Sequence, residues 1–192
     1  MKNSLLLLLN LVPAYAHAQN GKILSQKPVV YSDSLVFAVG RVKAQRIRSS
    51  PRFREVFEQT ETLAIVYRSG GLKIEGFVMQ PKKPGQYPCV IFCRGGHEDF
   101  SQIDVAYTSV LADMANHGYV VIASQLRGTP GSQGKDEFGG ADTLDVINCI
   151  PALNHFSKAD TSRIGLYGIS RGGMNALQVL RTQKSLLIAA GE

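Results

Sequence analysis

Three short runs of apolar residues, each followed by a loop and a segment of helical character, constrain this fold most strongly. The runs are residues 89–93, 119–123 and 164–167. Uninterrupted apolar strands of this kind are typical of a parallel sheet that is buried on both faces. Predicted helices follow the runs, at residues 103–116, 142–156 and 174–182. The alternation predicts an α/β fold, with an open, mostly parallel sheet and helices on both faces.

The loops that follow these strands are expected to meet. They begin at Arg94, Arg127 and Gly168, each at the carboxyl end of a predicted strand. In open α/β sheets, ligands bind beyond the carboxyl ends of the strands. The sequence therefore predicts one site built by three loops.

Residues typical of helix ends and turns support this order of elements. Ser101 with Asp104 resembles a capping box for the first helix, and Gly118 suits the position after its end. Asp142 is the expected N-cap of the second helix, with Asp145 at its third position. Upstream, residues 62–68 and 72–79 flank the turn Ser69-Gly70-Gly71, which predicts an N-terminal β-hairpin.

Composition excludes several classes of protein. The length of 192 residues suits one domain, and 44% hydrophobic with 19% charged residues excludes wholesale disorder. The net charge of +6 is diffuse and gives no basis for a nucleic-acid partner. Six basic residues and no acid lie between positions 41 and 54, which favours a solvated helix or linker, with an anionic surface as the alternative partner.

Cysteine and glycine patterns predict neither a metal site nor a nucleotide site. Cys89 and Cys93 lie about 13 Å apart on one strand, too far to share a metal or a disulfide, so we expect core residues there and at Cys149. The segment from Gly128 to Lys135 lacks the spacing of a phosphate loop. No cofactor is predicted.

The N-terminus has the pattern of a secretory signal peptide. Lys2 precedes an apolar stretch at residues 5–12, Pro13 ends it, and alanines at 14, 16 and 18 fit the cleavage pattern. The stretch is shorter than the roughly 20 residues that cross a bilayer. We expect cleavage near residue 16 or 18 and export to the periplasm or the medium, with no membrane span in the mature chain; a buried N-terminal helix is the alternative.

Residues 168–172 form the pattern G-x-S-x-G, with a predicted strand before it and a helix after it. Strand, tight turn and helix are the context that a nucleophile elbow requires. The turn strains the serine backbone, and Gly168, Gly172 and Gly173 would supply the small neighbours that it needs. Ser170 is therefore the candidate nucleophile, at a helix N-terminus that favours a developing oxyanion. A glycine-rich helix cap with an ordinary serine is the alternative.

An oxyanion hole needs two hydrogen-bond donors. One would be the backbone N–H of Arg171, the residue after the nucleophile. The second would come from the loop after residues 89–93, where Gly95 and Gly96 let the backbone approach a substrate carbonyl. A plain turn is the alternative for this loop.

The motifs together resemble the catalytic domain of the prolyl oligopeptidase-like (S9-type) α/β hydrolases. The resemblance rests on residues 67–76, 94–96, 127–128, 160–165 and 168–172, within residues 62–192. It implies the α/β-hydrolase fold and a serine hydrolase that cleaves peptide or ester bonds through a Ser-Asp-His triad, with Ser170 as the nucleophile. Arg171 stands where many relatives carry tyrosine. Typical members also carry a β-propeller, for which residues 20–61 are too few, so a carboxylesterase is an open alternative to a peptidase.

The triad partners of Ser170 are expected beyond residue 192. In α/β hydrolases the acid and then the histidine follow the serine. Here the only carboxylate side chain after Ser170 is that of Glu192, and no histidine follows. Residues 185–190 also read as a core strand at the end of the sequence, so we expect the C-terminal strands to be missing. His97 is a less favoured substitute base, because a base must contact the serine directly. A non-catalytic, truncated domain that acts as a binding module is the alternative from another class.

These interpretations divide the chain into three parts. Residues 1–18 are the expected signal peptide, residues 19–61 an N-terminal extension, and residues 62–192 the N-terminal, incomplete part of the catalytic domain.

Overall fold

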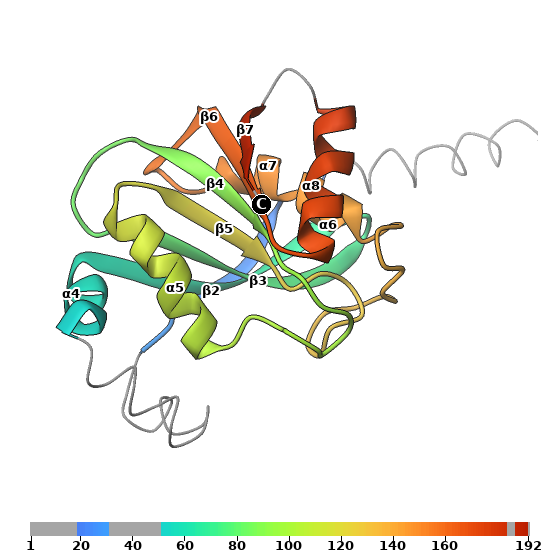
Figure 1. Cartoon of the computed structure of the whole chain (residues 1–192), viewed down its shortest axis with the longest axis horizontal. Coiled ribbons are helices and arrows are strands. Elements are labelled where there is room, and N and C mark those ends of the chain that lie inside the picture. The colour runs from blue at the N-terminus through green and yellow to red at the C-terminus, as the bar shows by residue number, and fades with distance from the viewer. Residues whose placement is uncertain (1–18, 31–50, 184–186, 192) are drawn as a thin grey trace, which may run out of the picture.

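The computed structural model describes residues 19–30, 51–183 and 187–191, which form a seven-stranded sheet with helices against it (Figure 1). The strands lie in the order β1-β2-β3-β5-β4-β6-β7. Their bounds are β1 Ile23–Pro28, β2 Thr60–Ser69, β3 Leu72–Pro81, β4 Tyr87–Cys93, β5 Val120–Ser124, β6 Ala159–Gly168 and β7 Leu187–Gly191. The helices are α4 Pro51–Gln59, α5 Val105–Asn116, α6 Thr143–Ile147, α7 Cys149–Leu153 and α8 Arg171–Thr182.

The sheet is mixed. β1, β2 and β3 pair antiparallel, and β3 also pairs antiparallel with β5. β5, β4, β6 and β7 run parallel to one another. The parallel half is the part that the three apolar runs predicted, and the β2–β3 hairpin confirms the predicted turn, with Gly70 and Gly71 at positive φ. The pairing of β1 with β2 was not predicted, because most of β1 is exposed and shows no apolar alternation.

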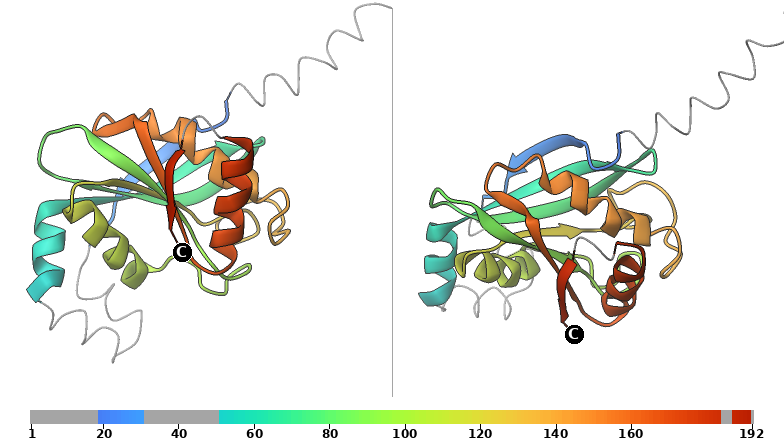
Figure 2. Two further views of the ribbon diagram at one scale, coloured as in Figure 1. Left: turned by 45° about the horizontal axis from the view of Figure 1, so that its top comes forward. Right: turned by 90° about the horizontal axis from the view of Figure 1, so that it is seen from above.

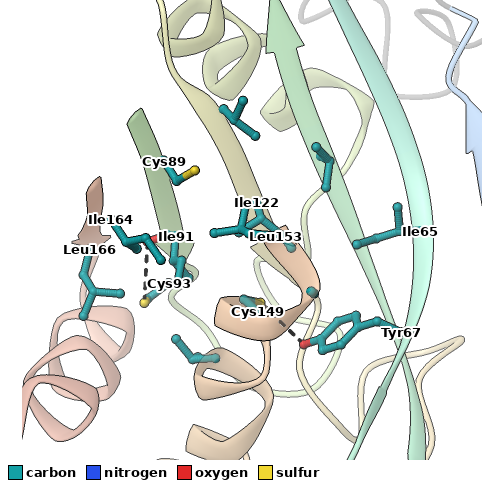
Figure 3. Packing of buried hydrophobic residues seen from close by; sticks show 14 of the residues in the cluster. Ile65, Tyr67, Cys89, Ile91, Cys93, Ile122, Cys149, Leu153, Ile164 and Leu166 are labelled. Carbon is teal, nitrogen blue, oxygen red and sulfur yellow. Dashed lines mark hydrogen bonds between the residues drawn. The ribbon is translucent and has the colours of Figure 1, made fainter. Parts of the chain in front are cut away.

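The parallel strands are buried on both faces because their side chains alternate between two clusters. Ile91 and Ile122 point into a larger cluster that α7 and α8 help to close (Figure 3). Phe92 and Val121 point to the opposite face, where α5 and Val56 of α4 cover them. Both views in Figure 2 show α4 and α5 side by side, away from α8. Helices on both faces are therefore confirmed.

All three cysteines are buried and free, as their pattern predicted. Figure 3 shows Cys89 and Cys93 on one strand among aliphatic side chains, with Cys149 on α7. Burial raises the pKa of the Cys89 thiol to about 12 and that of Cys149 to about 12. These thiols serve the core.

Two predicted helix starts were wrong in detail. Asp104 itself is the N-cap of α5 and accepts from the backbone N–H of Tyr107, so Ser101 is not the cap. α8 begins directly after Ser170 rather than at residue 174, because the elbow leads straight into the helix. Gly118 follows the end of α5 at positive φ, as expected.

The segment predicted as one helix over residues 142–156 is two short helices, α6 and α7. Pro151 lies within α7 and has no N–H to donate to the carbonyl of Ile147, four residues earlier, which favours the break at Asn148. The side chain of Asp142 also makes no cap bond to α6. Its carboxylate is used elsewhere, in the site described below.

No helix in the described ranges is long and apolar enough to cross a membrane. The predicted signal peptide at residues 1–18 and most of the basic cluster lie outside the described residues.

Candidate active site

Ser170 occupies a strained turn between β6 and α8. Its backbone has φ 57° and ψ −122°, a conformation that L-residues rarely adopt and that costs of order 1–3 kcal/mol. Its side chain is exposed to solvent. This is the strand–turn–helix geometry that the G-x-S-x-G pattern predicted, and it aims the serine out of the fold at the N-terminus of a helix.

The glycines of the elbow allow the chain to turn this tightly. A Cβ on Gly168 would overlap the carbonyl of Gly172, and one on Gly172 would overlap the carbonyl oxygen of Cys93. A Cβ on Gly173 would meet nothing within 4 Å, so the prediction that Gly173 is also needed was wrong. The turn therefore depends on Gly168 and Gly172.

The loop after β4 lies directly against the elbow. A Cβ on Gly95 would sit 3.3 Å from the Cβ of Ser170, and the backbone N–H of Ile169 donates to the Cys93 carbonyl at 3.3 Å. Gly96 has φ +79°, and a Cβ there would overlap the carbonyl of Phe100. The candidate nucleophile and the loop that carries Gly95 and Gly96 (the glycine loop) are thus neighbours, as predicted.

The first N–H groups of α8 belong to the elbow as well. The first four N–H groups of a helix have no acceptor within it. Gly172 and Gly173 donate theirs to the carbonyls of Ile169 and Ser170 at 2.9 Å. The N–H of Arg171 takes no part in these turn bonds, which leaves it as the donor that an oxyanion at Ser170 would meet.

The side chain of Arg171 turns away from this donor and is fully buried. It donates to both oxygens of Asp136 at 2.6 Å and to Asp142 at 2.7 Å. It also donates to the Gly96 carbonyl at 2.9 Å, and its guanidinium lies 4.9 Å from the ring centre of Phe138. Arg171 therefore joins the elbow to the glycine loop and to the loop before α6.

This cluster carries charge that remains ionised at neutral pH. Burial acts to raise the pKa of Asp136, but its hydrogen bonds with Arg171 and with two backbone N–H groups outweigh this and lower the pKa to about 2. Burial likewise opposes the charge of Arg171, while the carboxylates of Asp136 and Asp142 raise its pKa. Asp136 and Arg171 are therefore both charged at physiological pH.

Arg94 folds the glycine loop around its own guanidinium. The side chain is almost completely buried, and burial lowers its pKa, with the nearby charge of Arg171 acting in the same direction. Each of its five N–H groups has an acceptor, on Gln125, Gly95, Phe100, Glu98 and Thr129. One side chain thus sets the path of the loop that carries Gly95 and Gly96.

A second buried ion pair anchors the loop after β5. Arg127 contacts Asp145 through Nε at 3.0 Å, through a terminal nitrogen at 2.8 Å and through its backbone N–H at 2.8 Å. The hydrogen bond with Asp145 is the largest contribution to the raised pKa of Arg127. Ser69 of the hairpin donates to the same carboxylate at 2.6 Å. The three loops that begin at Arg94, Arg127 and Gly168 therefore converge, as predicted.

The buried charges were missed by sequence reasoning. Asp136 and Arg171 are separated by 35 residues, so no local spacing connects them. The available signal was an arginine next to the serine of the motif, together with acids in the loop that follows Arg127. Gly128 turns this loop back on itself, since a Cβ there would overlap the backbone of Asp136.

Within residues 19–30, 51–183 and 187–191, no hydrogen bond joins the side chain of Ser170 to a histidine or a carboxylate. His97, the less favoured substitute base, is half exposed and has its Nε2 3.9 Å from Asp136. Its ring lies 5.9 Å from that of Phe138. The same ranges hold no group of three His, Cys, Asp or Glu side chains able to bind a metal.

Comparison with known proteins places this geometry in a family. The peptidase YtmA of Bacillus subtilis, itself uncharacterised, is 30% identical over 123 residues, or 64% of this chain and 47% of that protein. The acylaminoacyl peptidase of Pyrococcus horikoshii superposes with a TM-score of 0.57 at 25% identity, covering 71% of this chain and 24% of that one. Esterase Est22 superposes with a TM-score of 0.58 at 18% identity, covering 84% and 54%, which shows a common fold.

The predicted resemblance to S9-type α/β hydrolases is confirmed by these likenesses. The chain spans less than half the length of the curated relatives that it matches. The family model described as Chlorophyllase matches residues 36–190, which include the elbow and the glycine loop. The chain therefore belongs to the chlorophyllase family of α/β hydrolases.

Proposed function

We propose that the protein is a serine hydrolase that cleaves peptide or ester bonds through an acyl-enzyme on Ser170. The observation that carries the proposal is the exposed serine at φ 57°, held at the N-terminus of α8 with Gly95 against it. Nucleophile elbows store such strain so that the serine oxygen stands clear of the sheet. The peptidase relatives and the esterase with the same fold support this class of reaction.

The steps of the reaction follow from the chemistry of a serine nucleophile. The Ser170 hydroxyl attacks the acyl carbon and gives its proton to a general base, the role that histidine fills in this fold. The carbonyl oxygen becomes an oxyanion, which the N–H of Arg171 and an N–H of Gly95 or Gly96 bind. The tetrahedral intermediate expels the leaving group with a proton, and water then hydrolyses the acyl-enzyme and regenerates Ser170.

A fluorophosphonate probe tests the nucleophile in the native protein. Trypsin releases residues 164–171 as one peptide, between Arg163 and Arg171, and Ser170 is its only serine. We expect the label on this peptide, and we expect Ser170→Ala to abolish it. Ser162→Ala, which removes an exposed serine two residues before the start of that peptide, is the matched control and should label normally. A folded protein without label on this peptide would contradict the proposal.

Peptide and ester substrates can be separated by paired chromogenic compounds. A p-nitrophenyl ester and an aminoacyl p-nitroanilide with the same acyl group report the two activities on one scale. Because the amide is intrinsically the harder bond to cleave, comparable kcat/KM values would support a peptidase. Turnover of the ester alone would support a carboxylesterase.

We also propose that the protein is exported after removal of residues 1–18. The proposal rests on the basic start, the short apolar stretch and the alanines of the cleavage pattern. N-terminal sequencing of the native protein should begin at His17 or Gln19. An N-terminus at Met1 or Lys2 on the folded protein would contradict export by this route.

A further inference from the structure

The carboxylate of Asp136 joins the segments that meet at the elbow. Its side chain is fully buried and accepts four hydrogen bonds. Two come from Arg171 at 2.6 Å, one from the backbone N–H of Glu98 at 3.0 Å and one from that of Phe138 at 2.8 Å. One carboxylate thus contacts the residue after the nucleophile, the glycine loop and the loop that precedes α6.

The bonds made by Asp136 bear on the two candidate oxyanion donors. Arg171 supplies one donor with its backbone, and its side chain binds the carbonyl of Gly96 in the loop that supplies the other. Asp136 holds that guanidinium and also holds Glu98, two residues beyond Gly96. The spacing between the donors therefore depends on buried hydrogen bonds of the Arg171 and Asp136 side chains, and not on backbone pairing alone.

Charge balance makes the carboxylate hard to replace. Arg94 and Arg171 are both buried, and the charge of Arg171 acts to lower the pKa of Arg94. Asp136 opposes this repulsion at both arginines. Without it, Asp142 would be left to pair with Arg171, and the repulsion between Arg171 and Arg94 would act to push the loop wrapped around Arg94 away from the elbow.

We propose that Asp136 is a positioning residue, which acts through Arg171 to hold the glycine loop at the distance where both backbone donors reach one oxyanion. The inference rests on the proposed function of Ser170. Asp136 itself touches no reacting atom, so its removal should weaken stabilisation of the transition state more than substrate binding.

The test is Asp136→Asn in the full-length protein, which keeps the volume of the side chain and removes its charge. Active sites are titrated with a fluorophosphonate, and hydrolysis of p-nitrophenyl acetate is expressed per labelled site. We expect kcat per site to fall about 10- to 100-fold, with a much smaller change in KM, because donors displaced by about 1 Å lose transition-state contacts. Affinity for a trifluoromethyl ketone, which forms a tetrahedral adduct, should fall in parallel.

Asp160→Asn is the control, since Asp160 also pairs with an arginine, Arg163, but at the start of β6, at the opposite end of the strand from Ser170. It should change stability only slightly and leave kcat per labelled site unchanged. An equal loss of kcat per labelled site in both variants would overturn the inference. An Asp136→Asn protein whose only change is a lower Tm would also overturn it. If Asp136→Asn does not fold, Arg171→Lys serves instead, because lysine keeps the charge and loses the fork. Absence of label on the unsubstituted protein would refute the hydrolase itself, which is a separate outcome.

Discussion

At the scale of single residues, glycines and buried charges determine the geometry around Ser170. Gly172 is required because the carbonyl of Cys93 occupies the place of a side chain, whereas Gly173 faces open space. Arg94 and Arg171 are buried with acceptors for nearly all of their N–H groups, although Nε of Arg171 has none among the described residues. Removing one partner of a buried ion pair is costly because it leaves the other charge buried and uncompensated.

Two neighbouring glycines of α8 should respond oppositely to alanine. Gly172→Ala is expected to lower the free energy of unfolding by about 1–3 kcal/mol or more and to abolish labelling of Ser170, because the new Cβ separates α8 from β4. Gly173→Ala should raise stability by about 0.5–1 kcal/mol through helix propensity. Urea unfolding with fluorophosphonate labelling measures both effects. Equal changes in stability and labelling in the two variants would show that the elbow tolerates a side chain at position 172.

The ion pair at Asp136 predicts a change of stability in acid. Its pKa is about 2 in the folded protein against 3.8 ordinarily, so its contribution is complete above about pH 4 and is lost as the pH falls through 2. The difference in unfolding free energy between the unsubstituted protein and Asp136→Asn should therefore be constant from pH 7 to 5 and narrow below pH 4. Urea titrations at several pH values measure it. A difference in unfolding free energy that widens in acid would contradict the lowered pKa of Asp136.

At the scale of elements, the site depends on which strands end side by side. β4 and β6 are neighbours, and Cys93 lies opposite Gly168, so their loops leave the sheet at the same point. The apolar strands were predictable because burial on both faces leaves an unbroken hydrophobic run. β1 was not, because its exposed side chains leave no such pattern. The break between α6 and α7, which Pro151 favours, was also missed.

The start of α5 provides a test at this scale. Asp104 accepts from the N–H of Tyr107 at 2.7 Å, so Asp104→Ala should cost about 1 kcal/mol of stability. Ser101→Gly keeps the positive φ of that residue and removes its hydroxyl, and it should leave stability unchanged. Thermal unfolding of the two variants distinguishes the observed cap from the predicted capping box. A larger loss for Ser101→Gly would favour the capping box.

At the scale of the whole molecule, one sheet separates two hydrophobic clusters, and the three cysteines lie within the larger one. Burial keeps all three thiols protonated by raising their pKa values. Iodoacetamide at pH 8 should therefore leave Cys89, Cys93 and Cys149 unmodified in the folded protein and alkylate all three in urea. Peptide mapping measures this, and alkylation of Cys149 at the rate of the unfolded chain would contradict the packing.

The sequence alone determined the alternation of strands and helices, the hairpin and the place of Ser170, because these depend on local patterns of apolar residues and glycines. Tertiary structure alone decided what holds the site together. Asp136, Asp142 and Arg171 are distant in the chain, and their pairing follows from the strand order that brings three loops to one end of the sheet. A charge buried in a fold needs a partner. The sequence does not show which residue this partner is, because the two residues meet only when the chain is packed.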